Sequence, residues 1–167
     1  MFYVVYVATF LALPRDRASA LYARTEWSQR QVILLIVGKL FALAVLASVI
    51  LTPLRPLTVL SGLGWALYLL GMVGFSVALL HFCGAAEGKP ATNGLYAVSR
   101  NPQQVSLAIM FLDLCLIIAS GVALVAFVIG QAFSRSGIRA QEEACLRQFG
   151  ESYRAYMQRV PRYLPWF

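Results

Sequence analysis

The sequence predicts an all-α fold: a polytopic integral-membrane helical bundle of about five membrane segments, the last two forming a helical hairpin, followed by C-terminal interfacial helices. Two observations predict this class. First, 60% of the 167 residues are hydrophobic and only 13% are charged, with a mean hydropathy of +0.71, which is outside the usual composition of a soluble domain. Second, apolar runs long enough to cross a bilayer alternate with short polar segments. We treat residues 1–167 as a single membrane domain, with N-terminal spans over 1–82 and a polar loop, hairpin and tail over 83–167.

The first three membrane segments follow from hydropathy. Residues 1–13 are apolar but lack the basic start and small-residue cleavage site of a signal peptide, so they are expected to be a retained short span. Residues 31–52 form a clear span, close to the roughly 20 residues needed to cross a bilayer core. After the turn at residues 53–56, residues 59–82 form another span, whose glycines let a neighbouring helix approach closely.

The apolar run of 29 residues at 105–133 is too long for one segment and short for two. The Ser120-Gly121 pair near its middle offers a turn. If the run folds back there, every segment with basic residues except the turn that holds Arg55 falls on the same side of the membrane. The positive-inside rule then makes that side, with the C-terminus, cytoplasmic. We therefore predict a hairpin, which brings the polar loop before it and the tail after it to one face.

The tail carries an apolar and aromatic stripe at spacings of three and four residues, formed by Leu146, Phe149, Tyr153, Tyr156 and Val160. This pattern predicts one or two short helices lying at the membrane surface. Gly150 is the expected break between them, and Pro161 the expected end.

Composition also argues against several site classes. Cys83, Cys115 and Cys145 have no CxxC spacing, so neither a metal site nor a disulfide framework is indicated, and they are expected to be small buried hydrophobic residues. The net charge of +7 comes from basic residues dispersed through loops. Membrane topology accounts for them, so no nucleic-acid partner is expected.

Two charges and one histidine lie at the apolar segments. Lys39 and Asp113 sit inside spans, where a charge costs at least about 2.5 kcal/mol. The structural interpretation, a snorkelling Lys39 and an Asp113 that is neutral or paired with Lys39, is favoured over a catalytic one. His81, at the end of a span, is either an ordinary interfacial residue or a ligand contact.

The short stretch "GLYAVSRNPQQ" at residues 94–104 and the pair Glu142 and Glu143 in the tail carry the more informative polar groups. The guanidinium of Arg100 suits a carboxylate or phosphate, Asn101 both donates and accepts, and a glutamate accepts from ribose hydroxyls or an amine. From physical chemistry alone, these residues could equally be a helix start and a solvated charged face. Arg139 and Glu143, four residues apart, could likewise be only a surface ion pair.

The order of these elements along the chain favours a functional interpretation of these residues over a purely structural one. "GLYAVSRNPQ", an apolar hairpin and then "RAQEEACLRQFGESYRAYMQRVPRYLP" resemble the isoprenylcysteine carboxyl methyltransferase and phospholipid methyltransferase group of integral-membrane enzymes. That group shows a G-x-Y-x-x-x-R-[HN]-P-x-Y block, a hairpin, and an E-E-x-x-L tail that ends in V-P-R. The resemblance covers about residues 88–165.

The resemblance implies methyl transfer from S-adenosyl-L-methionine to a lipophilic small-molecule or lipid acceptor that arrives from the bilayer. The cofactor would be held on the cytoplasmic side by the R-[HN]-P block and the tail. Carried over by position, the implied cofactor contacts are His81, Gly88, Lys89, Pro90, Ala91, Tyr96, Arg100, Asn101, Pro102, Gln103, Gln104 and one of Glu142 and Glu143. The implied catalytic residues are Arg139, which would orient the acceptor, and the same glutamate pair.

Two departures from the group's pattern stand out. Gln104 occupies the usual tyrosine position, and the spacing to Phe149 leaves open which glutamate aligns. A carboxylate acceptor, such as a prenylcysteine-like one, needs no general base, whereas an amine would, and the sequence offers no clear base beyond a glutamate or His81. This favours a carboxylate or another ready nucleophile. The alternatives are a catalytically inactive relative that acts as a membrane scaffold, and a small transporter that uses Lys39 and Asp113, for which we find no inverted repeat.

Overall fold

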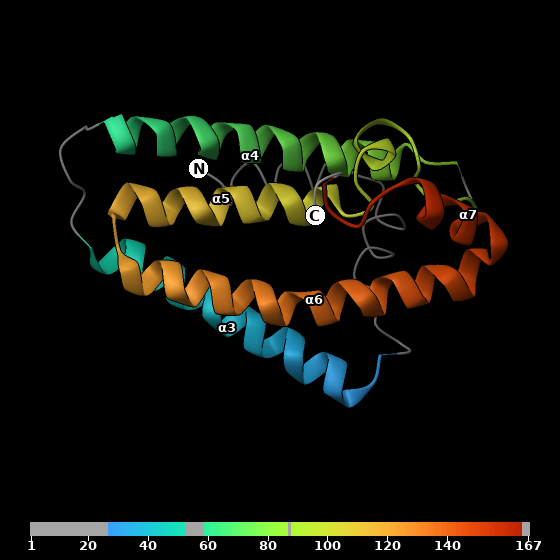
Figure 1. Ribbon diagram of the computed structural model, residues 1–167, viewed down its shortest axis with the longest axis horizontal. Helices are drawn as coiled ribbons and strands as arrows, with labels where there is room; N and C mark the ends of the chain where they lie inside the picture. Colours follow the sequence, from blue (N-terminus) through green and yellow to red (C-terminus); the bar gives the residue numbers. More distant parts are fainter. Residues whose placement is uncertain (1–26, 53–58, 87, 165–167) are drawn as a thin grey trace. The chain divides into compact units, whose positions relative to one another are not determined.

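The computed structural model describes residues 27–52, 59–86 and 88–164, which are all-helical with no strand in those ranges (Figure 1). The helices run in the order α3 (Gln29–Leu51), α4 (Val59–Cys83), the short 3-10 helix η1 (Gly94–Ala97), α5 (Pro102–Ile118), α6 (Gly121–Phe149) and α7 (Glu151–Arg159). The all-α prediction is confirmed. The predicted first span at residues 1–13 lies outside the described residues.

The chain divides into two compact units, and α4, α5 and α6 each contribute to both. Of the described residues, the loop-tail unit comprises 72–105 and 142–164, and the hairpin unit comprises 27–71 and 106–141. Each unit is described below by itself.

In the hairpin unit, α3 begins where the sequence provides a cap. The Ser28 hydroxyl accepts a hydrogen bond from the Gln31 backbone N–H at 3.3 Å, and the Gln31 side chain accepts from the Ser28 backbone N–H at 2.9 Å. This reciprocal capping box satisfies two of the helix's otherwise unpaired amide donors. The predicted span at residues 31–52 is therefore present, beginning two residues earlier.

The glycines of α4 allow close packing on α5 inside the hairpin unit. A methyl group at Gly71 would lie 2.5 Å from Met110 Cγ, and one at Gly64 would lie 2.6 Å from Ile117 Cγ1. Real Cβ atoms do not come that close, so a side chain at either position would require Met110 or Ile117 to move, and at Gly71 it would also lie 2.9 Å from the Ser106 carbonyl oxygen. The predicted use of glycine for helix contact is confirmed at these two positions.

The predicted hairpin is confirmed within the hairpin unit. α5 ends at Ile118, Ala119 takes a left-handed φ of 49°, and α6 starts at Gly121. The turn is closed by a hydrogen bond from the Ala119 N–H to the Leu116 carbonyl at 3.2 Å, and the Ser120 hydroxyl accepts from the Ala123 N–H at 3.3 Å. The two arms pack together beside the turn, in a buried cluster of Val45, Cys115, Ile118 and Ala123.

The second arm of the hairpin differs from the prediction. The apolar run was expected to end at Phe133 and give way to a surface tail, but α6 continues as one helix of 29 residues to Phe149. The composition becomes polar there, but no proline interrupts the helix, and its internal glycines are used for packing. The predicted break at Gly150 is confirmed, because this residue has a φ of +55° and separates α6 from α7.

Glycines also bring α3 and α6 together as antiparallel neighbours in the hairpin unit. A methyl group at Gly130 would lie 3.1 Å from Phe41 Cβ, and one at Gly137 would lie 3.2 Å from Leu35 Cδ1. The Phe41 and Phe133 rings stack in parallel with their centroids 6.1 Å apart. Trp27, just before the N-cap of α3, lies against Gly137.

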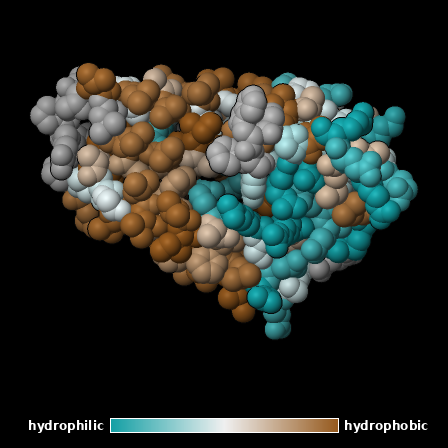
Figure 2. All heavy atoms as spheres, in the orientation of Figure 1, coloured by the Kyte–Doolittle hydropathy of each residue, from teal (hydrophilic) through white to brown (hydrophobic). Residues whose placement is uncertain are grey.

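Much of the outer surface of the hairpin unit is hydrophobic, as a bilayer requires. Large apolar side chains such as Ile50, Leu51, Val59 and Val122 are more than three quarters exposed, and Figure 2 shows the hydrophobic surface in brown. Among the described residues, three helices have the length and hydropathy of membrane spans, α3, α4 and α6, while α5 is a shorter apolar helix of 17 residues. The protein is therefore a helical membrane protein, and the number of five segments stays a prediction.

Candidate cofactor-binding site

The polar loop after α4 is held at the end of that helix by His81. Its Nδ1 accepts a hydrogen bond from the Leu95 backbone N–H at 3.1 Å. Gly94, with a φ of +61°, allows the loop to lie against the imidazole, because a side chain at this position would collide with the His81 ring. The structure therefore gives His81 a role in placing the loop.

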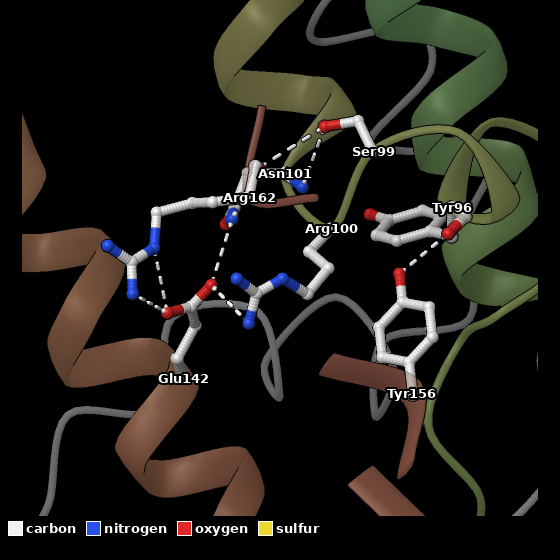
Figure 3. Close-up of polar contacts among 7 residues, drawn as sticks. All are labelled: Tyr96, Ser99, Arg100, Asn101, Glu142, Tyr156 and Arg162. Atoms are coloured by element: carbon white, nitrogen blue, oxygen red, sulfur yellow. Dashed lines mark hydrogen bonds and ion pairs between the residues drawn. The ribbon is translucent and has the colours of Figure 1, made fainter. Parts of the chain in front are cut away.

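Tyr96, in η1, is buried and linked to two other elements of the loop-tail unit, and Figure 3 shows the link to Tyr156. Its phenolic oxygen accepts from Gln103 Nε2 at 3.1 Å, and its backbone carbonyl accepts from the Tyr156 hydroxyl at 2.7 Å. Burial raises the pKa of Tyr96 above its ordinary value, and it raises the pKa of Tyr156 to about 12. Both phenols therefore stay protonated at neutral pH and act as hydrogen-bonding groups.

The segment before α5 is joined to the chain's last described residues mainly through backbone carbonyls. The Arg100 N–H donates to the Pro161 carbonyl at 3.0 Å. The Arg162 carbonyl accepts from Asn101 Nδ2 at 3.1 Å and from the Ser99 hydroxyl at 3.3 Å. The loop and the tail, about 60 residues apart in sequence, thus meet in one unit, as the hairpin predicted.

Glu142 lies at the centre of this junction and is only 4% exposed (Figure 3). Its Oε2 accepts from Arg162 Nε at 2.9 Å and Nη2 at 2.6 Å, while its Oε1 lies 3.2 Å from Arg100 Nη1. Asn101 Nδ2 is 3.5 Å from Oε1, at the limit of a hydrogen bond. The hydrogen bond to Glu142 raises the pKa of Arg162 further. Two guanidinium groups against one carboxylate leave the cluster with a net charge of +1.

Arg100 still has donors to offer. Its side chain is 9% exposed, and its Nε and Nη1 are buried without a hydrogen-bond partner among the described residues. The Nη1 contact with Glu142 is an ion pair by distance, but it does not have the geometry of a hydrogen bond. Buried donors of this kind are costly unless something accepts from them. A carboxylate or phosphate on a ligand would supply the missing acceptor.

The structure brings together five of the predicted site residues: Tyr96, Arg100, Asn101, Gln103 and Glu142. It also separates the glutamate pair, since Glu142 is buried and Glu143 is exposed. Pro102 begins α5 as predicted, and Gln104 follows in its first turn.

Other predicted residues lie apart from these contacts. Gly88, Lys89, Pro90 and Ala91 belong to the loop-tail unit, but no hydrogen bond or ion pair of the described residues joins them to Glu142 or Arg100. Arg139 belongs to the hairpin unit and is exposed.

The sequence reasoning missed three residues of the junction: Ser99, Tyr156 as a hydrogen-bond donor, and above all Arg162. The V-P-R ending of the tail was the available signal for Arg162. Tyr156 was assigned to a stripe lying on the membrane surface. Instead, Tyr153, Tyr156 and Val160 form a buried cluster of the loop-tail unit, packed by Cys145, Leu146, Phe149 and Met157. The aromatic side chains of α7 are buried because the last turns of α6 pack against them.

The suggested pairing of Lys39 with Asp113 is wrong. Asp113 is fully buried, and neither carboxyl oxygen has a hydrogen-bond partner among the described residues. Lys39 is exposed on α3. A buried carboxyl without a donor is far more stable neutral than ionised, so the structure favours the neutral alternative for Asp113.

Comparison with known proteins matches the chain to one protein family. The family model described as Phospholipid methyltransferase matches residues 58–152, which is more than half of the chain and includes both Arg100 and Glu142. A search of curated proteins found no significant match. With the helical membrane fold and the clustered Arg100, Asn101 and Glu142 already in place, this match shows that the chain belongs to the phospholipid methyltransferase family.

Proposed function

We propose that the protein is a membrane methyltransferase that uses S-adenosyl-L-methionine to methylate a lipophilic acceptor. The observation that carries the proposal is the buried Arg100, whose Nε and Nη1 have no hydrogen-bond partner among the described residues. Arg100 lies in the segment that matches the family, beside Glu142 and in a cluster of net charge +1. Such a site favours a ligand that brings a carboxylate, as S-adenosylmethionine does.

The residues of the junction suit this cofactor in distinct ways. Arg100 would bind its carboxylate, and Asn101 and Tyr96 offer polar atoms close by. Glu142 has its carboxylate occupied by Arg162 and Arg100, so it would hold these arginines in place and not receive a ribose hydroxyl. When bound, the cofactor supplies an activated sulfonium methyl group. The protein then has to align an acceptor and exclude water, and orientation can contribute up to about 7 to 11 kcal/mol.

The described residues favour an acceptor that is already a nucleophile. Burial keeps Tyr96 and Tyr156 protonated, His81 Nδ1 is engaged with Leu95, and Glu142 is bound by arginines. None of these four is well placed to remove a proton from an amine. A lipid-borne carboxylate, such as a prenylcysteine-like one, needs no such step. We also propose that the junction and the tail face the cytoplasm, on the basis of arginine distribution in the sequence.

The test is isothermal titration of the purified protein with S-adenosylhomocysteine, which keeps the carboxylate. The wild-type protein should bind, and Arg100→Ala should lower the affinity about 10- to 150-fold, the value of a hydrogen bond to a charged group. Arg154→Ala is the matched control, because Arg154 also loses an ion pair, with Glu151, but its side chain is 64% exposed.

No heat from the wild-type protein at high micromolar ligand would contradict the proposal, as would an equal loss in Arg154→Ala. If the wild-type protein binds as expected, the acceptor can be sought by transfer of a radiolabelled methyl group into a lipid extract. A labelled lipid that is lost with Arg100→Ala would identify it.

A further inference from the structure

A second cationic site lies in the hairpin unit, where α3 and α6 pack side by side. A groove of about 520 Å³ is lined by Arg30 from the first turn of α3 and by Arg135 and Arg139 from α6. Leu34 and Ala132 form its apolar part. The packing of α3 on Gly130 and Gly137 of α6, described above, brings these side chains together from opposite ends of the sequence.

The three arginines have no counter-charge among the described residues. None of them forms an ion pair with a described acidic residue, the groove lining contains no Asp or Glu, and the first turn of α3 has none either. Three like charges converging on one groove repel each other. An anion that enters the groove removes this repulsion and accepts from the guanidinium groups.

The groove also lies where both helices change from polar to apolar. On α3, Arg30 and Gln31 precede the apolar residues that start at Val32, and on α6 the apolar run ends just before Ser134. Because the helices are antiparallel, their polar ends lie at the same end of the pair, and Ser134 lies beside Gly38, less than two helical turns beyond Val32. This is the arrangement expected at the level of lipid headgroups, with arginines on the aqueous side and Leu34 and Ala132 on the hydrocarbon side.

Along the same helices, the exposed side chains near the groove are mostly hydrophobic, with Lys39 of α3 as an exception. Ile33 and Leu40 of α3 and Val128 of α6 are each 58% exposed. A molecule with its anionic group among the arginines would therefore find apolar surface for its acyl chains. A free inorganic anion would contact only the arginines of the groove and would leave its apolar part unused.

We propose that this groove binds the headgroup of an anionic phospholipid from the bilayer, through Arg30, Arg135 and Arg139, as a bound lipid distinct from the methyl acceptor. This gives Arg139 a different role from the acceptor contact that the family resemblance implies. The lining has no carboxylate to receive an ammonium group, so a headgroup with net negative charge is preferred over a zwitterionic one. The binding does not depend on methyl transfer, and it goes beyond the proposed function.

The experiment is native mass spectrometry of the full chain in neutral detergent, titrated separately with phosphatidylglycerol and phosphatidylcholine of the same acyl chains. Phosphatidylglycerol should bind with at least tenfold higher affinity. The double variant Arg30→Gln with Arg135→Gln should bind it about 30-fold more weakly, since each arginine near a membrane surface contributes about 1 kcal/mol. Its melting temperature without lipid and its binding of S-adenosylhomocysteine should match those of the wild type, which separates this test from the cofactor test.

The charge-matched control is Arg154→Gln with Arg159→Gln, two exposed positions on α7. It should retain phosphatidylglycerol within threefold of the wild type. If the groove double variant melts lower, the two single variants replace it, each with an expected loss of about fivefold. Equal binding of the two lipids, or equal losses in the groove and control variants, would overturn the proposal. Displacement of the lipid by millimolar inorganic phosphate would assign the groove to a free anion instead.

Discussion

Replacing Glu142 tests whether the junction between loop and tail depends on one carboxylate. Glu142→Gln keeps the size of the side chain but removes the charge that faces Arg100 and Arg162. Taking one partner from a buried ion pair costs about 3 to 5 kcal/mol, because the other charge stays buried and uncompensated. The Arg100 side chain is 9% exposed, so it bears this cost almost fully, whereas the Arg162 side chain is 33% exposed and is partly solvated. We therefore expect the lower end of the range, about 3 kcal/mol.

The assay is thermal unfolding in a mild detergent. For a chain of this length, about 3 kcal/mol corresponds to a melting temperature roughly 6 to 12 °C lower. Glu143→Gln is the matched control: it makes the same chemical change one residue later, at an exposed position, and should cost less than about 1 kcal/mol. The double variant Glu142→Gln with Arg162→Gln should lose less than the sum of the two single losses, since the two residues share an interaction.

A Glu142→Gln protein that melts within 2 °C of the wild type would refute the reasoning. So would a Glu143→Gln protein that loses as much stability, because the burial of Glu142 would then have no consequence. Additive losses in the double variant would mean that the contact with Arg162 contributes nothing.

Tyr156→Phe should cost about 1 kcal/mol through loss of its buried hydrogen bond, measured as a lower melting temperature at pH 7. Because its pKa is raised to about 12, the wild-type protein should lose stability as pH rises from about 10 to 12, where the unfolded chain ionises first, and Tyr156→Phe should show a smaller loss over that window. Asp113→Asn should change the melting temperature little or raise it, since no partner is lost, and a large decrease would show that the carboxylate has a hidden partner. Gly94→Ala should destabilise the protein more than Gly88→Ala: both glycines have positive φ, but only at Gly94 does the new methyl group collide, with His81, and equal melting temperatures would contradict this.

The sequence was sufficient for features that depend on local chemistry. Hydropathy located the spans that correspond to α3 and α4, Ser120-Gly121 marked the hairpin turn within one or two residues, and Gly150 marked the break before α7. Pro102 began a helix because its fixed φ and missing N–H suit the first turn. The family's motif then indicated that the segments on either side of the hairpin belong to one site.

Features that depend on helix phase or on long-range contacts were not predictable. Adjacent residues on a helix point about 100° apart, so the choice between Glu142 and Glu143 depended on how far α6 continues, which the loss of hydropathy after Phe133 concealed. The pairing of Lys39 with Asp113 failed for a similar reason. Two charges in neighbouring spans meet only if both face inward, and Lys39 faces outward.

The tail meets the loop through the backbone carbonyls of Pro161 and Arg162, so substitutions and insertions in the tail should affect this contact differently. A carbonyl is present whatever the side chain, so many replacements at position 161 would keep the contact. A single inserted or deleted residue between Phe149 and Pro161 would instead turn both carbonyls away from their donors. The length of this connection, more than its composition, is therefore what the closure of the site requires.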